Sequence, residues 1–270
     1  GHLVALAIET RERDAVAEEL RLALEREKEL VELKTNFVTL VSHEFRTPLG
    51  IIYSAADILD NYHDRLSAAE RVNQLDDIRH SARRMTGLME EVLLVGKMES
   101  AGMVCRRDPL DLAGFCRRIV DEQLSSAEAL SRIDLTLDGI DCQATGDESL
   151  LRHIVGNLLS NAVKYSPGAP AVRFTVRRDG TVAELEIHDW GIGIDLADEP
   201  QLFVAFQRGR NAADFPGTGL GLVIVKRCVA LHQGTIAFQS SPGAGTCFTV
   251  RLPIFPSNSS RKRRRATTHA

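Results

Sequence analysis

The chain has 270 residues, 44% of them hydrophobic, which is enough for one large or two medium-sized domains. Its formal net charge is −4 despite a basic run at residues 261–265, so the remainder is more acidic still and does not suit general nucleic-acid binding. The five cysteines are odd in number and never spaced as CxxC, which favours reduced thiols in a cytoplasmic compartment over disulfides or zinc. No apolar stretch approaches the ~18 residues of a membrane span.

The first residues carry a short apolar run, at 3–8, that predicts a strand. This run resembles the final strand and exit linker of a PAS-type sensor, so we expect residues 1–10 to be the end of an upstream sensor domain. The same expectation includes an upstream region, outside this chain, that could tether the protein to a membrane.

From about residue 10 to residue 62 the pattern is helical and is interrupted only by Pro48. Seam positions recur at alternating spacings of three and four: Leu20, Ala23, Glu27, Leu30, Lys34, Phe37 and Val41. This period predicts a two-stranded coiled-coil linker over residues 11–35 that leads into a packed helix. A polar break at 61–67 and a second helical pattern over 68–99 predict an all-α helical hairpin. Two hairpins would form a four-helix bundle in a homodimer.

The most informative segment, residues 42–49, reads SHEFRTPL and lies inside the first helical pattern. It places an imidazole at His43, a carboxylate at Glu44 and a hydroxyl at Thr47, all just before Pro48. A proline inside a helix removes a hydrogen bond and costs roughly 3 kcal/mol, so its presence indicates a functional reason. We expect His43 to project from the helix and to receive a chemical group.

After residue 102 the pattern changes to short alternating segments. Strands are expected near 133–137, 172–176, 182–187, 235–238 and 246–252, and helices near 112–130, 148–165 and 219–232. This order predicts an α+β two-layer sandwich over residues 105–255, one sheet covered by a layer of helices. Residues 256–270 are expected to be a disordered basic tail, for which a solvated segment is the simpler interpretation and an anionic partner the alternative.

The helix expected at 148–165 carries Asn157 and Asn161 four residues apart, hence on one face, with Lys164 and Tyr165 beside them. Amide oxygens are hard ligands that suit Mg²⁺, and a lysine is a point charge for phosphate. The alternative is that two asparagines simply lie on a solvated helix face.

Two glycine-containing segments follow strands or open a helix. In the first, residues 189–193, Asp189 could accept a hydrogen bond from an exocyclic amine such as that of adenine, while Gly191 and Gly193 allow close backbone approach; a plain turn is the alternative. In the second, residues 217–221 (GTGLG), backbone amides before a helix could bind phosphate. The polar segment before it, residues 195–216, is typical of a mobile lid.

Two further segments complete the pattern. Residues 203–208 could pack their aromatic rings under the lid and leave Arg208 for nearby charge. Residues 243–246, with Thr246 at the end, form a turn between the last expected strands, for which an ordinary hairpin is the alternative.

In this order and spacing, the segments resemble the boxes of the sensor histidine kinases of two-component systems, over about residues 10–253. Residues 42–49 resemble the H box, 157–166 the N box, 189–193 the first glycine box and 203–208 the F box. Residues 217–221 and 243–246 resemble the later glycine boxes. One departure is Trp190, which stands where that family usually has asparagine.

The resemblance implies that residues 36–101 are a dimerisation and histidine-phosphotransfer domain and that residues 105–255 are a Bergerat-type ATP-binding domain. His43 would take the γ-phosphate of ATP, helped by Glu44. Asn161, assisted by Asn157, would hold Mg²⁺, and Asp189 would accept from adenine. The remaining expected nucleotide contacts are Lys164, Tyr165, Gly191, Gly193, Arg208, Gly217, Thr218, Gly219, Leu220, Gly221 and Thr246.

The implied partner is the receiver domain of a separate response regulator, and Glu44 with Thr47 matches the ExxT pattern associated with dephosphorylating it. Two other functions stay open from the residues: a nucleotide-binding scaffold without transfer, and a Bergerat-type ATPase. The second is disfavoured because Asn157 stands where the related ATPases carry a glutamate that activates water.

Overall fold

The computed structural model describes residues 2–99, 103–125, 132–140, 143–168, 170–212, 215 and 217–256. These residues form two compact units that divide between Met85 and Thr86. The tail expected at 256–270 lies outside the described residues from 257 onward. No helix within the described ranges combines the length and the apolar character that a membrane crossing would need.

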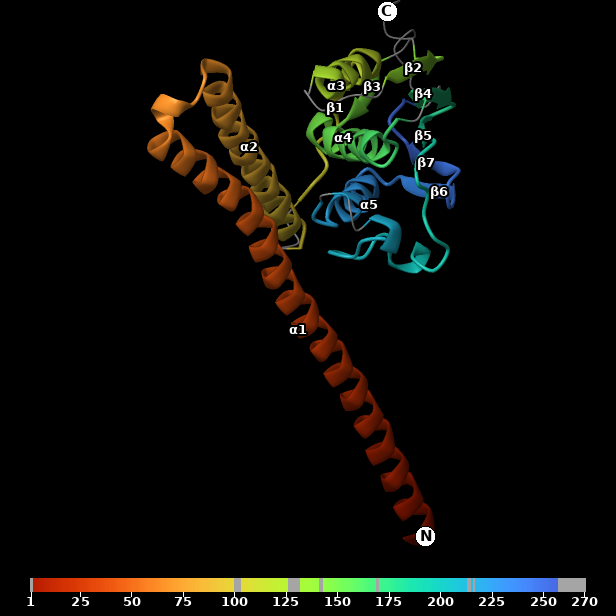
Figure 1. Cartoon of the computed structure of the whole chain (residues 1–270). Helices are drawn as coiled ribbons and strands as arrows, with labels where there is room; N and C mark the ends of the chain where they lie inside the picture. The colour runs from red at the N-terminus through yellow and green to blue at the C-terminus, as the bar shows by residue number, and fades with distance from the viewer. Residues whose placement is uncertain are drawn as a thin grey trace, which may run out of the picture. The chain divides into compact units, whose positions relative to one another are not determined.

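Residues 2–99 form a helical hairpin whose second helix begins in the first unit and ends in the second. Helix α1 (His2–Asn61) continues through Pro48, a short 3-10 helix η1 (His63–Arg65) makes the turn, and α2 (Ala68–Glu99) returns (Figure 1). A reciprocal cap starts α2: the Ser67 hydroxyl accepts from the Glu70 N–H, and the Glu70 carboxylate accepts from the Ser67 N–H at 2.8 Å. The expected hairpin is therefore confirmed, including both limits of its second helix.

The strand expected at residues 3–8 is wrong, because the backbone there is already part of α1. A short apolar run fits a buried helix turn as well as a strand, and here the adjoining helical pattern prevails. Of the coiled-coil positions, Leu20 is 60% exposed in this single chain. The side chains of Ala23, Leu30, Lys34 and Phe37 lie outside the described set.

The second unit contains a five-stranded sheet in the order β2-β4-β5-β7-β6, with β2 and β4 parallel and the other pairs antiparallel. Its strands are β2 (Ile133–Asp138), β4 (Val172–Asp179), β5 (Val182–Asp189), β6 (Thr235–Ser241) and β7 (Gly245–Leu252). Two short strands that the sequence pattern did not predict, β1 (Asp108–Leu110) and β3 (Ala144–Gly146), form a separate antiparallel pair.

Three helices, α3 (Leu112–Ser125), α4 (Glu148–Lys164) and α5 (Gly221–Leu231), cover one face of this sheet (Figure 1). Alternation along the strands explains the arrangement, since Phe174, Leu185 and Val250 point into the core and are fully buried. The opposite face carries ion pairs such as Arg177–Glu184 at 2.8 Å. The expected two-layer α+β sandwich is confirmed.

The division between the units falls inside α2 rather than at the linker expected near residues 101–105. Its physical cause is packing: Leu94 and Val95, near the end of α2, are 8% exposed and belong to the hydrophobic core of the second unit. The last turns of α2 are thus part of the same compact body as the sheet.

Candidate functional site

His43 and Thr47 are exposed on one face of α1, four residues apart. Between them, Glu44 is largely covered, with 14% of its side chain exposed, and its carboxylate pairs with Arg84 of α2 at 3.2 Å. The first unit therefore presents an accessible imidazole, as expected, with the neighbouring carboxylate held by an arginine. Sequence reasoning did not identify Arg84, because the pairing depends on the hairpin bringing positions 40 residues apart together.

Helix α4 positions the two asparagines. Asp147 caps its N-terminus by accepting from the N–H groups of Ser149 and Leu150, at 3.1 and 3.2 Å. Further along, the Asn157 amide N–H₂ donates to the His153 carbonyl at 2.8 Å. Its oxygen consequently lies toward Gly221, where an added Cβ would come within 2.9 Å of it.

Asp189 ends β5 as a buried carboxyl group, 6% exposed. Its Oδ1 accepts from the N–H groups of Gly191, at 2.9 Å, and Thr246, at 3.3 Å. Burial raises the pKa of Asp189, and these two hydrogen bonds oppose the rise. Both of these backbone donors bind Oδ1, so Oδ2 could accept a hydrogen bond from an N–H group of a ligand.

Glycines next to Asp189 are required by close backbone contacts. A Cβ at Gly191 would lie 2.0 Å from the Tyr165 carbonyl oxygen, and one at Gly193 would lie 2.0 Å from the Ser241 carbonyl oxygen. Gly193 also has φ of +66°, in the left-handed region that side chains disfavour. The segment at 189–193 is therefore packed directly against the end of α4 and the turn before β7.

The glycine-rich segment at residues 217–221 precedes α5 and contacts α4. A Cβ at Gly217 would lie 2.8 Å from the Lys164 ammonium, and one at Gly221 would meet Asn157. Thr218 Oγ1 accepts from the Leu220 N–H at 3.1 Å, and Gly219, with φ of +71°, makes the turn. This brings together the two segments expected to bind phosphate.

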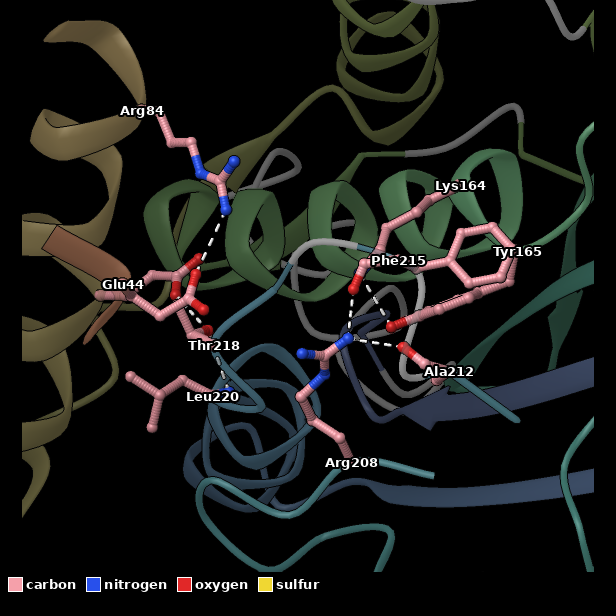
Figure 2. A network of polar contacts seen from close by, with 10 residues as sticks. Glu44, Arg84, Lys164, Tyr165, Arg208, Ala212, Phe215, Thr218 and Leu220 are labelled. Carbon is pink, nitrogen blue, oxygen red and sulfur yellow. Dashed lines mark hydrogen bonds and ion pairs between the residues drawn. The ribbon is translucent and has the colours of Figure 1, made fainter. Parts of the chain in front are cut away.

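Lys164 and Tyr165 link this region to the Asp189 side. The Lys164 ammonium donates to the Tyr165 hydroxyl at 2.8 Å and lies 4.3 Å from the centre of its ring, while Phe215 packs edge-on against that ring at 5.1 Å (Figure 2). Contacts thus run continuously from Asp189 through Tyr165 and Lys164 to Gly217. Phe215 was not among the expected site residues, although an aromatic side chain in a polar lid segment could have drawn attention.

Arg208 makes hydrogen bonds to the backbone of the residues that follow it. Figure 2 shows its guanidinium donating to the carbonyl oxygens of Ala212 and Phe215. Nearby, Phe206 has φ of +67° and its N–H donates to the Gly219 carbonyl at 3.2 Å. Arg208 therefore connects residues within the segment that was expected to be a lid, and Phe206 connects that segment to the glycine loop.

Trp190 stacks on His188, with ring centres 4.4 Å apart, and carries the Arg173 guanidinium 5.2 Å from its own ring centre. His188 and Arg173 pair across β5 and β4 on the sheet face opposite the helices. The Trp190 ring therefore packs on side chains of that face. His232 is fully buried, and its two ring nitrogens form hydrogen bonds with the Asp147 N–H and the Cys228 carbonyl oxygen.

The site therefore combines the Asp189 carboxyl group, the Lys164 ammonium and the Asn157 amide oxygen with two closely packed glycine segments. The donor set suits Mg²⁺, because Asn157 directs a hard amide oxygen toward the glycine loop and Asn161 lies one turn further along the same helix. Within the described ranges, no group of three or more His, Cys, Asp or Glu side chains could hold a metal by itself.

Comparison with known proteins identifies both halves of the chain. Residues 33–101 match the family described as His Kinase A (phospho-acceptor) domain. Residues 146–256 match the family described as Histidine kinase-, DNA gyrase B-, and HSP90-like ATPase. Each match contains the segment that the sequence pattern singled out in that half.

Similar proteins include Drug sensory protein A of Synechocystis sp., 34% identical over 86% of this chain and 37% of the relative. Sensor-like histidine kinase SenX3 of Mycolicibacterium smegmatis is 32% identical over 83% of this chain and 58% of the relative. The chain thus spans between 37% and 58% of the length of these curated relatives. Full-length ShkA, solved in complex with AMPPNP, has a TM-score of 0.59 at 26% identity, over 82% of this chain and 46% of that structure.

Both domain families are present in this chain, and two relatives named as sensor proteins, SenX3 and PhoR, each match 83% of it. The chain belongs to the sensor histidine kinases of two-component systems.

Proposed function

We propose that this chain is an ATP-dependent histidine kinase that moves the γ-phosphoryl group of ATP to His43. The observation that supports this most is the contact of the glycine loop with α4, where Gly217 meets Lys164 and Gly221 meets Asn157. The phosphates of ATP at this junction could contact backbone N–H groups of the glycine loop, the Lys164 ammonium and, through Mg²⁺, the Asn157 amide oxygen. Asp189 would accept from the adenine amine at the other end of the contact path.

In the transfer step, the lone pair of His43 Nε2 forms a bond to the γ-phosphorus. The bond from that phosphorus to the bridging oxygen breaks, ADP leaves, and the proton on Nδ1 passes to a base or to solvent. Glu44 is the candidate base, and its Oε2 pairs with Arg84 at 3.2 Å in this structure. Mg²⁺, held by Asn161 and Asn157, would supply charge neutralisation on the phosphates.

Asn157 favours a kinase over an ATPase. An amide cannot take a proton from water, and its N–H₂ already donates to the His153 carbonyl. The γ-phosphate would consequently stay intact until an imidazole reaches it.

The proposed partners are a second copy of the chain, the receiver domain of a response regulator and an upstream sensor domain. Both helices of the hairpin leave large apolar side chains uncovered, including Leu49, Tyr53, Val72 and Leu75, which are between 42% and 76% exposed. Burying these surfaces against a second hairpin would complete a four-helix bundle.

We also propose that Glu44 and Thr47 support dephosphorylation of the regulator. Thr47 is exposed one turn after His43, where its hydroxyl could orient a water molecule. Thr47→Ala should reduce dephosphorylation of a phosphorylated regulator and leave autophosphorylation intact; equal loss of both activities would argue against this role.

Incubation of the full chain with γ-labelled ATP tests the main proposal. A label on the protein that is lost in acid and retained in alkali supports a phosphohistidine. Release of inorganic phosphate without labelling would indicate an ATPase instead. Nucleotide binding with neither outcome would indicate a signalling scaffold.

A further inference from the structure

A carboxylate from α2 reaches into the region proposed to bind phosphate. Thr218, in the glycine loop, donates its hydroxyl to Glu91 Oε2 at 2.9 Å. Glu91 lies on the last turns of α2, which belong to the second unit. The buried side chains of Leu94 and Val95 on the same helix segment belong to this unit's hydrophobic core and keep the segment close to it. Glu91 is therefore held at the glycine loop by packing as well as by its hydrogen bond.

The surroundings of Glu91 are those expected for a phosphate oxygen. Lys164 contributes an attractive charge, and the Thr218 hydroxyl both donates to Glu91 and accepts from the Leu220 N–H. Figure 2 shows Thr218 and Leu220 in this arrangement. Gly217, beside the Lys164 ammonium, completes the group. Apart from the helix that carries Glu91, these residues are the ones assigned above to nucleotide binding.

The charged form of Glu91 is destabilised at this position, which favours its displacement by another anion. Burial raises the pKa of Glu91, and the Thr218 hydrogen bond and the Lys164 charge offset that rise only in part. The half-buried Glu91 carboxylate therefore makes a few polar contacts at the loop that a triphosphate, with more charge and more acceptor oxygens, would replace.

We propose that Glu91 is an internal anion that occupies part of the phosphate subsite, so that its contact with Thr218 and nucleotide binding exclude each other. The contact is autoinhibitory, and the inference rests on the function proposed above. Because linkage is reciprocal, whatever moves the end of α2 away from the loop strengthens ATP binding, and ATP loosens the end of α2. A signal from an upstream sensor domain that displaced the end of α2 would therefore change the affinity of the nucleotide site.

Calorimetric titration of the full chain tests this directly, using a non-hydrolysable ATP analogue with Mg²⁺, and adenosine as a second ligand. Glu91→Gln removes the charge but keeps an oxygen that can accept from Thr218. We expect the analogue to bind about 5-fold tighter or more, and adenosine to bind within about twofold of wild type, because adenosine has no phosphate to compete with Glu91.

Glu90→Gln is the matched control, since Glu90 carries the same charge on the same helix but is exposed and acts electrostatically on His153. It should leave both affinities unchanged. Equal tightening by Glu90→Gln, or equal effects of Glu91→Gln on the analogue and adenosine, would overturn the inference. So would unchanged binding of the analogue to Glu91→Gln when adenosine still binds. If no variant and no wild-type protein binds either ligand, the proposed function itself fails.

Hydrogen exchange of the unmodified protein gives a second test that does not depend on a variant. Adding the ATP analogue should speed exchange of backbone amides in residues 86–99, while adenosine should not. Unchanged or slower exchange there in the presence of the bound analogue would contradict mutual exclusion.

Discussion

The face of α1 that carries His43 and the region around Asp189, Lys164 and Gly217 in the second unit are built in opposite ways. His43 and Thr47 share one turn of α1, are exposed, and depend on the rest of the fold only through the helix. Asp189, Lys164 and Gly217 come from a strand, a helix and a loop, and are connected through contacts of Gly191 and Tyr165. Substitutions in the first region should therefore change function with little effect on stability, whereas substitutions in the second region should often change both.

The largest stability effect should come from Gly193→Ala. The new Cβ would lie 2.0 Å from the Ser241 carbonyl oxygen at a residue with φ of +66°, so strain and overpacking should lower the free energy of unfolding by about 2–5 kcal/mol. Denaturant unfolding measures this. Gly156→Ala is the control: it lies within α4 with open space around it, and should stabilise by about 0.5–1 kcal/mol. Equal stabilities of the two variants would contradict this expectation.

Asp189→Asn should separate ligand binding from folding in the same region. The amide oxygen can still accept from Gly191 and Thr246, so the fold should persist, but the amide presents an N–H₂ group where an adenine amine needs an acceptor. We expect ATP affinity to fall about 10-fold or more, measured by calorimetry. Asp179→Asn, at the opposite end of the β4–β5 pair, should have wild-type affinity. A wild-type affinity for Asp189→Asn would remove Asp189 from the site.

The second unit should also lose stability in mild acid because of His232. Its Nε2 accepts from the Asp147 N–H at 3.3 Å, so Nδ1 carries the proton that it donates to the Cys228 carbonyl, and the ring is neutral. Burial lowers the pKa of His232 below 6.5, so the unfolded chain takes up the proton first. Its contribution is present above pH 6.5 and is lost as pH falls from 6.5 toward the folded pKa, by up to about 1.4 kcal/mol per pH unit.

Unfolding measured at about pH 7.5 and about pH 5 checks this pH dependence. His232→Gln should lose less stability between the two values; some loss should remain, because burial also lowers the pKa of His153. An identical loss in the variant and the wild type would contradict the assignment to His232.

Arg84→Ala in the first unit should have only a small effect on stability. The Arg84–Glu44 pair is partly exposed, with 40% and 14% of the two side chains accessible, so its removal should cost at most about 1 kcal/mol. The more exposed pair of Arg79 and Asp76 is the comparison, and Arg79→Ala should cost less. A loss of several kcal/mol for Arg84→Ala would show that folding and the acceptor region are not separable.

Local patterns predicted most of the fold and the candidate site residues, because strand alternation and helix periodicity depend on neighbours in sequence. They failed at residues 3–8, where six apolar residues do not distinguish a strand from a helix, and at β1 and β3, which are too short to show alternation. Arg84, Glu91 and Phe215 were missed for another reason. Their partners are distant in sequence, and only the folded chain brings them together.

The proposed nucleotide site lies in the second unit, whose residues 146–256 match the Histidine kinase-, DNA gyrase B-, and HSP90-like ATPase family, whereas the proposed acceptor, His43, is exposed on the first unit. The most direct test is to titrate His43→Gln with the ATP analogue and incubate it with γ-labelled ATP. The account predicts wild-type affinity for the analogue and no label on the protein. Persistent acid-labile labelling, or loss of nucleotide binding in this variant, would contradict it.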